Sequence, residues 1–370
     1  MTIPETNLFT PHLLQGMELR NRLIRSATLE GLCGVDGQAT PILIDLYRQL
    51  AAGGCSLLIS GNAHILEEGK LISTGLGANC DEQLAGLEKL AAAVHQEGGK
   101  FCLQLGHTGG QGRSKICGRQ PLAPSAIKLE QYSEIPQEMA TSDIEKVIAA
   151  FATAAARAKR AGCDAVQLHA AHGYLVNQFL SPLTNQRQDN YGGDLAGRSR
   201  FLLAIVSAVQ QAVGKEYPLL VKLNGSDNLA GGLDVEEAIE VAKMLDAAGI
   251  AAIEVSGGTP ASGDLGPIRP DHESSNELAY NVILSRTIKQ QVECPIIAVG
   301  GIRSLHVATG LLRTGQADYI SLCRPLIREP DLPNKLQNGS SDKSTCTSCN
   351  GCLKTMLKGN FHCVLEPDRT

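Results

Sequence analysis

The sequence lacks long hydrophobic runs and a strong excess of either charge. No apolar stretch approaches the roughly 20 residues of a membrane-spanning helix, and no charged segment followed by an apolar one opens the chain. We therefore expect a cytoplasmic protein that is not bound to a membrane. The net charge of -5 over 370 residues comes from well-mixed signs, which argues against a nucleic-acid partner and favours a small molecule.

Two further absences bear on the fold. No linker rich in Pro, Gly or Ser occurs before residue 337, and the turn after the first apolar run contains no GxGxxG motif. The missing motif argues against an open doubly wound sheet. Short apolar runs instead predict eight strands, at 22–26, 56–60, 101–105, 165–169, 219–223, 251–255, 296–300 and 318–322.

Longer segments with apolar residues at helical spacing follow each predicted strand. They lie at about 41–52, 82–98, 142–161, 195–213, 235–248, 276–292, 304–314 and 325–336, with Ser142, Asp194 and Asp234 as helix caps. Eight strand-helix repeats predict a (β/α)8 TIM barrel over residues 1–336. Residues 8–23 are expected to form a hairpin that closes the barrel bottom, and residues 337–370 a C-terminal extension.

Polar residues and glycines collect at the ends of the predicted strands, where barrel enzymes carry their chemistry. The turns after the last two strands contain Gly301, Ile302 and Arg303, and then Cys323 and Arg324. Backbone N-H groups and helix starts at these turns predict a phosphate cradle. A phosphorylated substrate, tight turns alone and a flavin phosphate remain alternatives at this point.

Other polar side chains are expected to face the centre of the barrel mouth. Lys222 and Gln104, with the backbone of residues 26–28, could contact the pyrimidine end of a flavin, because a cation there stabilises its anionic reduced form. A surface ion pair is the plainer interpretation of the lysine. His169, His172 and Tyr174 fall in one short run, HAAHGY. Such a group can hold an anionic oxygen and donate a proton; zinc chelation competes, but no third ligand lies nearby in sequence.

The run HAAHGYLVNQFLSPLTNQRQDNYGGDLAGRSRF at 169–201 closely resembles the signature of the old yellow enzyme family of FMN-dependent oxidoreductases. The segments LRNRLIRSAT, LQLGHTGGQ, AVGGIR and CRPLIREP occur in the family's order. This resemblance covers residues 7–336. It implies an FMN-dependent enzyme that reduces an activated C=C bond, such as an α,β-unsaturated carbonyl, with electrons from NAD(P)H or a partner protein.

The resemblance also implies roles for individual residues. His169 and His172 would bind the substrate's carbonyl oxygen, and Tyr174 would donate the proton to the α-carbon. FMN would be held by Ser26, Ala27, Thr28, Leu29, Asn62, Gln104, Lys222, Gly301, Ile302, Arg303, Cys323 and Arg324. Two positions depart from the family's pattern: Leu29 stands where many members have Cys or Thr, and Lys222 replaces an arginine, which keeps the charge but loses the bidentate geometry.

Four of the twelve cysteines lie close together in the C-terminal extension. Cys346, Cys349, Cys352 and Cys363 give the spacing C-x2-C-x2-C-x10-C. Three close thiolates and one distant thiolate suit a 4Fe-4S cluster better than a zinc ribbon, although zinc or unliganded thiols remain open. The spacing is similar to that in two larger family members, dienoyl-CoA reductase and trimethylamine dehydrogenase. A cluster would imply an electron-transfer partner, since the chain ends at Thr370.

Two other functions compete with reduction of an activated alkene. An amine-type dehydrogenase could pass electrons out through the cluster, although the histidine pair suits a carbonyl oxygen better. A barrel without FMN could carry a structural zinc tail. A homo-oligomer is compatible with the Leu-, Ala- and Gly-rich outer helices.

Overall fold

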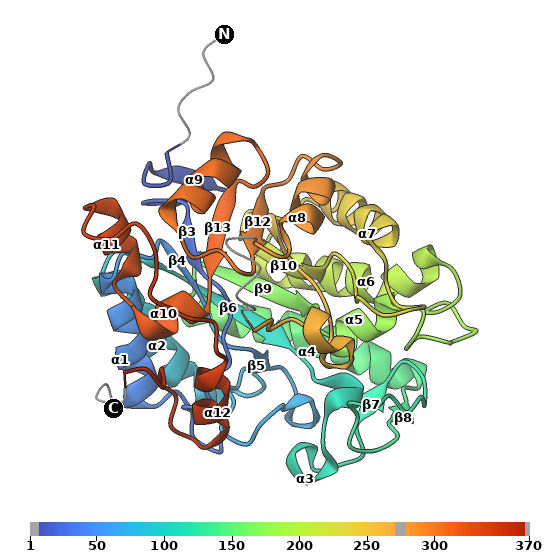
Figure 1. Ribbon diagram of the computed structural model, residues 1–370. Helices are drawn as coiled ribbons and strands as arrows, with labels where there is room; N and C mark the ends of the chain where they lie inside the picture. Colours follow the sequence, from blue (N-terminus) through green and yellow to red (C-terminus); the bar gives the residue numbers. More distant parts are fainter. Residues whose placement is uncertain (1–6, 271–278, 367–370) are drawn as a thin grey trace.

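The chain folds into a closed parallel barrel surrounded by helices (Figure 1). The computed structural model describes residues 7–270 and 279–366. Each barrel strand pairs in parallel with the next, and pairing between β4 and β6 completes the circle. The strands are β3 (Leu23–Arg25), β4 (Leu57–Ile59), β6 (Lys100–Gly106), β9 (Ala165–Ala170), β10 (Leu219–Asn224), β11 (Ala252–Ser256), β12 (Ile296–Val299) and β13 (Tyr319–Leu322). The predicted (β/α)8 fold is confirmed.

Helices cover the outside of the strands and bury an apolar layer against them. Phe151, Phe201 and Ile205, for example, have no solvent exposure. The helices of the ring are α1 (Pro41–Ala52), α2 (Leu84–Gln96), α4 (Thr141–Arg160), α6 (Leu195–Val213), α7 (Val235–Ala247), α8 (Val282–Lys289), α9 (Leu305–Arg313), α10 (Arg324–Arg328) and α11 (Leu332–Gln337). No helix in the described part of the chain is both long and apolar enough to cross a bilayer.

The ends of three helices differ from the sequence prediction. The prediction of a single helix at 325–336 is wrong. The segment forms two helices, α10 and α11, which are separated at Glu329, where φ and ψ are -133° and 82°. Pro330 follows, and a residue before proline is disfavoured in the α conformation. The helix expected from residue 276 begins at Val282; residues 276–278 lie outside the described ranges.

The predicted caps are only partly correct. The carboxylates of Asp194 and Asp234 accept hydrogen bonds from the backbone N-H groups of Gly197 and Glu237, as expected for N-caps. Ser142 is not a cap, because it lies inside the first turn of α4. The nearby carboxylate of Asp143 instead accepts from the N-H of Ala140.

A hairpin closes the barrel end opposite the site. Strands β1 (His12–Leu14) and β2 (Met17–Leu19) pair in antiparallel fashion, and Leu14, Met17 and Leu19 pack with apolar residues from the starts of the barrel strands. The expected bottom lid is confirmed. The smaller elements are β5 (Ala63–His64), β7 (Leu122–Ala123), β8 (Gln137–Glu138), α3 (Ser114–Cys117), α5 (Leu175–Leu180), α12 (Gly351–Leu357) and the 3-10 turns at Glu67–Gly69, Asp81–Gln83, Gly109–Gln111 and Pro260–Leu265.

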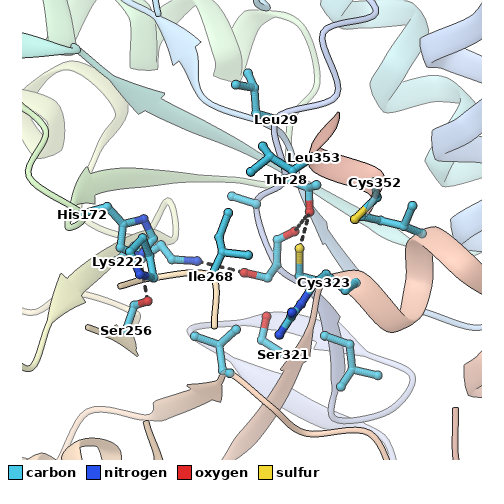
Figure 2. A pocket seen from close by; sticks show the side chains of 18 of the residues that line it. Thr28, Leu29, His172, Lys222, Ser256, Ile268, Ser321, Cys323, Cys352 and Leu353 are labelled. Carbon is cyan, nitrogen blue, oxygen red and sulfur yellow. Dashed lines mark hydrogen bonds between the residues drawn. The ribbon is translucent and has the colours of Figure 1, made fainter. Parts of the chain in front are cut away.

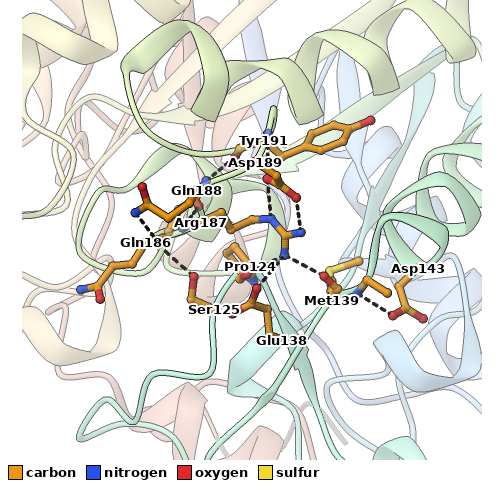
Figure 3. Close-up of polar contacts among 12 residues, drawn as sticks. Pro124, Ser125, Glu138, Met139, Asp143, Gln186, Arg187, Gln188, Asp189 and Tyr191 are labelled. Atoms are coloured by element: carbon orange, nitrogen blue, oxygen red, sulfur yellow. Dashed lines mark hydrogen bonds and ion pairs between the residues drawn. The ribbon is translucent and has the colours of Figure 1, made fainter.

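The loop between α5 and α6 is fixed by one buried arginine (Figure 3). Arg187 Nη1 donates to the carbonyl oxygens of Pro124 and Met139 at 2.9 and 2.7 Å. Its Nε and Nη2 donate to the two carboxylate oxygens of Asp189 at 3.0 and 2.5 Å. Because these donors all have partners, Arg187 joins the loop to the β7–β8 region.

Candidate active site

The predicted site residues surround one cavity at the carboxyl ends of the barrel strands (Figure 2). The cavity has a volume of about 310 Å³. Its lining contains Ser26, Ala27, Thr28, Leu29, Asn62, Gln104, His169, His172, Tyr174, Lys222, Gly301, Ile302, Arg303, Cys323 and Arg324. Sequence positions as distant as 26 and 324 thus meet because parallel strands all end at the same rim of a barrel.

Two histidines and a tyrosine form one wall of this cavity. The rings of His169 and His172 are nearly perpendicular, with centroids 5.2 Å apart, and the His169 ring lies 4.9 Å from that of Tyr174. His172 Nε2 is hydrogen-bonded to Ser256 Oγ at 2.7 Å, whereas His169 Nδ1 is buried without a partner among the described residues. Both imidazoles and the phenol belong to residues that line the cavity, so the wall can present polar groups to a ligand.

The backbone places His172 in an unusual conformation. Its φ is +62°, in the left-handed region that only a few per cent of residues other than glycine adopt, with Asn, Asp and His the most frequent of them. Its N-H donates to Asn224 Oδ1 at 3.1 Å, and the following Gly173 N-H donates to Asn177 Oδ1 at 2.6 Å. These two amide side chains hold the turn that brings both imidazoles to the same wall.

Both histidines are neutral at physiological pH. Burial, followed by the charge of Lys222, lowers the pKa of His169 to about 3. Burial, His169 and Lys222 lower the pKa of His172 well below its ordinary value. Burial also raises the pKa of Tyr174 to about 12, so the phenol keeps its proton. The wall therefore offers uncharged hydrogen-bond donors to an oxygen atom and one phenolic proton.

Lys222 lines the cavity and is buried. Its Nζ donates to Ser26 Oγ at 2.9 Å and lies 3.3 Å from a carboxylate oxygen of Glu254. Sequence reasoning did not select Glu254 as a site residue. Its only signal was an acidic residue inside the otherwise apolar strand run AAIEV, and the strand register places it directly beside Lys222.

The opposite end of the cavity is built from the last two strand ends. Gly300 and Gly301 adopt φ values of +109° and +79°. A Cβ at Gly300 would come within 2.6 Å of the Tyr280 ring, so this turn requires glycine. Cys323 precedes α10, and its Sγ lies 3.2 Å from Thr28 Oγ1.

The C-terminal extension lies against this end of the cavity. Arg324 Nη1 donates to Asn350 Oδ1 at 2.7 Å, and Arg303 Nη1 donates to the carbonyl of Cys346 at 3.0 Å. Sequence reasoning did not place any part of the extension at the site, because no local pattern reveals where a tail docks. Its residues in the cavity lining are Ser348, Asn350, Cys352, Leu353, Met356 and Phe361.

The four cysteines of the extension gather around a second, small cavity. Cys346, Cys349, Cys352 and Cys363 line it together, and none of them forms a disulfide. Across residues 7–270 and 279–366, however, no group of three or more His, Cys, Asp or Glu side chains is placed to hold a metal ion. The thiols thus share one location without forming a complete ligand set.

The main cavity fits a flavin mononucleotide. It offers a buried cation at Lys222, amide groups at Gln104 and Asn62, and two arginines at its glycine-rich end. Asn62 is part of the cavity lining, and its Oδ1 is buried without a partner among the described residues. A cation at one end and a phosphate-binding turn at the other are what a flavin ring and its phosphate require.

The fold and cavity define a flavin-binding barrel, and comparison with known proteins gives its family. Residues 7–343 match the model of the NADH:flavin oxidoreductase / NADH oxidase family, to which the chain belongs. It is 36% identical over 367 residues to an NADH oxidase of Thermoanaerobacter brockii, covering 98% of this chain and 56% of the relative. It is 37% identical to an NADPH dehydrogenase of Geobacillus sp. (strain WCH70), covering 89% of this chain and 93% of that protein.

A solved structure supports the same assignment. The old yellow enzyme homologue from Zymomonas mobilis superposes with a TM-score of 0.82 at 28% identity, covering 96% of this chain and 98% of that one. The chain thus has the barrel fold of the old yellow enzymes and belongs to their flavin oxidoreductase family. It spans only about half the length of the Thermoanaerobacter relative.

Proposed function

We propose that the protein reduces the C=C bond of an α,β-unsaturated carbonyl compound, with NADH or NADPH as the source of electrons. FMN, when bound, supplies the hydride that is transferred to the β-carbon of the substrate. The observation that carries the proposal is the pair of neutral imidazoles, set at right angles with Tyr174 beside them. An amine substrate has no oxygen for such a pair to bind, which disfavours amine oxidation.

Each residue of the histidine wall has a distinct task in this proposal. His169 and His172 donate hydrogen bonds to the carbonyl oxygen and so stabilise the negative charge that develops there. Tyr174 donates its proton to the α-carbon, and the phenolate it leaves is a much weaker base than that carbon. Ser256 fixes the His172 ring through the bond to Nε2.

The cofactor contacts follow from the cavity. Lys222 and Gln104 hold the pyrimidine end of FMN, with Asn62 and residues 26–29 along the ring. The turn of residues 301–303, together with Cys323 and Arg324, receives the phosphate. Leu29 and the lysine at 222 distinguish this site from the more common pattern of the family.

The test is an anaerobic purification followed by a visible spectrum and a turnover assay. We expect flavin absorption that NADH or NADPH bleaches, and that 2-cyclohexen-1-one restores with formation of cyclohexanone. A protein that takes up FMN but does not reduce the enone would contradict the substrate class. A protein that cannot take up FMN would contradict the whole proposal.

We further propose that Cys346, Cys349, Cys352 and Cys363 bind a 4Fe-4S cluster that exchanges electrons with a partner protein. The shared small cavity and the spacing of the thiols support this. Iron and sulfide assays on the same anaerobic sample test it, and four irons and four sulfides per chain are expected. Zinc without sulfide would favour a structural zinc tail. If the sample contained neither iron nor zinc, the thiols would have no metal-binding role.

A further inference from the structure

A buried polar network lies beneath the cavity at its lysine end. Glu254 Oε1 accepts a hydrogen bond from Ser26 Oγ at 2.7 Å, and Oε2 accepts one from Gln167 Nε2 at 2.9 Å. Gln167 Oε1 in turn accepts from Gln104 Nε2 at 2.7 Å. Lys222 Nζ donates to the same Ser26 Oγ at 2.9 Å. The five side chains come from different strand ends and form one connected set.

The network has two tiers. Ser26, Gln104 and Lys222 line the cavity, whereas Gln167 and Glu254 do not and are fully buried, each with no solvent exposure. The lower tier therefore touches a bound ligand only through the upper one. Its contribution must be to position the upper residues or to change their charge.

Glu254 is ionised in spite of its burial. Burial opposes ionisation, but the charge of Lys222 and hydrogen bonds from Ser26 and Gln167 outweigh it and lower the pKa of this carboxyl. Lys222 and Glu254 thus form a buried ion pair with Nζ and Oε1 3.3 Å apart. A buried pair costs desolvation energy and is weak evidence for stabilisation of the fold, so its place under the cofactor site calls for another reason.

The direction of its effect follows from electrostatics. An unpaired cation beside the pyrimidine end favours the anionic reduced flavin and raises the reduction potential. A carboxylate in contact with that cation offsets part of its field, and the offset is large because both groups lie in a medium of low dielectric constant. Lys222 with Glu254 therefore favours reduced flavin less than Lys222 alone would.

We propose that Glu254 is a positioning residue that holds Lys222 in a paired state and so sets a low reduction potential for the bound FMN. This inference rests on the proposed FMN site. It does not depend on the substrate, the cysteines or a partner. A low potential makes the reduced site a stronger hydride donor, and it requires a strongly reducing nicotinamide or protein donor.

The experiment compares FMN-loaded wild type with Glu254→Gln. Glutamine keeps the size of the side chain, and its amide oxygen can still accept the hydrogen bond from Ser26, while one negative charge beside Lys222 is lost. The readout is the midpoint potential of bound FMN by dye equilibration. We expect reduced FMN to be favoured over oxidised FMN at least about tenfold more than in wild type, a rise of about 30 mV for a two-electron couple.

Two controls isolate the pair. Glu236→Gln removes an exposed carboxylate on α7 and should leave the potential unchanged. Lys222→Met should lower the potential, and adding Glu254→Gln to it should change little, because an unpaired Glu254 in that site takes up a proton. An effect of Glu254→Gln that is the same with and without Lys222 would overturn the pairing role.

The outcomes separate this inference from the proposed function. An unchanged potential in FMN-loaded Glu254→Gln overturns the inference and leaves the FMN site intact. A wild type that binds no FMN overturns the proposed function first. If Glu254→Gln does not fold, Glu254→Asp keeps the charge but withdraws it from Lys222, and a smaller rise in potential is expected; no rise would again overturn the inference.

Discussion

Two segments of the run at 169–193 use their buried polar side chains in different ways. Residues 169–174 present polar groups to a cavity, and the buried Nδ1 of His169 has no partner among the described residues. In residues 185–193, Arg187 directs its donors to two carbonyl oxygens and to the carboxylate of Asp189 (Figure 3). The first segment lines the cavity with its rings, and the second uses the donors of Arg187 to hold a loop.

This difference shows how residues that bind a ligand can be told apart from residues that stabilise the fold within one sequence motif. Both segments contain a buried polar side chain, His169 in the first and Arg187 in the second, so burial of a polar residue does not distinguish them. Satisfaction of hydrogen bonds does, because an unpaired buried polar group costs stability unless a ligand completes it. Substitutions in the first segment should therefore reduce activity, and substitutions in the second segment should reduce stability.

The largest effect is expected from removing both imidazoles. His169→Ala with His172→Ala should lower kcat/KM for 2-cyclohexen-1-one by at least about 10³-fold, since one lost oxyanion donor already costs about 10² to 10³. The variant should also fail to bind phenol, whose oxygen would be held by the same two imidazoles, while FMN remains bound. The exposed His306 on α9 provides the matched control His306→Ala, for which no change is expected. Enone reduction at the parent rate would contradict the carbonyl-binding role.

Arg187→Ala should test the structural role of residues 185–193. Removing the guanidinium leaves two buried carbonyl oxygens without donors and takes the cation from Asp189, which keeps the backbone N-H of Tyr191. This loss should cost about 3 kcal/mol in the free energy of unfolding. Urea unfolding followed by circular dichroism measures it, because the chain has no tryptophan. Activity per folded, FMN-loaded molecule should change little.

The matched control for Arg187 is Arg200→Ala. Arg200 is exposed and donates to the carbonyl of Asn190, so a loss below about 0.5 kcal/mol is expected. Equal losses for the two variants would argue against Arg187 as the residue that holds the loop.

Tyr174→Phe should slow reoxidation of the flavin by the enone about 10²-fold, as expected for loss of a general acid. Reduction of the flavin by NADH or NADPH should be nearly unaffected, because it needs no proton at the α-carbon. Stopped-flow absorbance separates the two half-reactions. Tyr191→Phe, with its ring packed near Phe179 outside the cavity, is the control, and equal slowing of both half-reactions would exclude a proton donor.

The smallest effect concerns pH. The pKa of His169 falls from 6.5 to about 3 on folding, so the unfolded chain binds a proton between these values and the folded chain does not. Stability is therefore lost as the pH falls below 6.5, by roughly 1 to 2 kcal/mol for this residue between pH 6.5 and pH 5. Urea unfolding of the histidine double variant should show a shallower decline over this range. Parallel curves for both proteins would mean that the imidazoles are not held neutral by the fold.

Much of the fold could be read from the sequence. Strands such as 296–300 are apolar on both faces, because helices cover one side and the barrel interior lies on the other. A short continuous apolar run therefore predicts a buried strand. The candidate site residues were predictable for a related reason, since polar residues directly after such strands have to meet at one rim. The break at Glu329 was missed because the run 325–336 retains helical spacing on both sides of Pro330.

Other parts of the site could not be predicted locally. Ser256 contacts His172, and Glu254 contacts Lys222, across 84 and 32 positions of sequence. Nothing in the neighbourhood of either residue specifies its partner. The extension carries no pattern that predicts Leu353 or Met356 in the cavity lining.

The sequence by itself determined the alternation of strand and helix, the rim that collects the polar residues and the identity of the groups placed there. These follow from hydrophobic periodicity and from the common direction of parallel strands, which are local properties. Only the tertiary structure decided which buried groups are paired and which are left for a ligand. Pairing depends on strand register and on closure of the barrel, and both are set by packing among residues far apart in the chain.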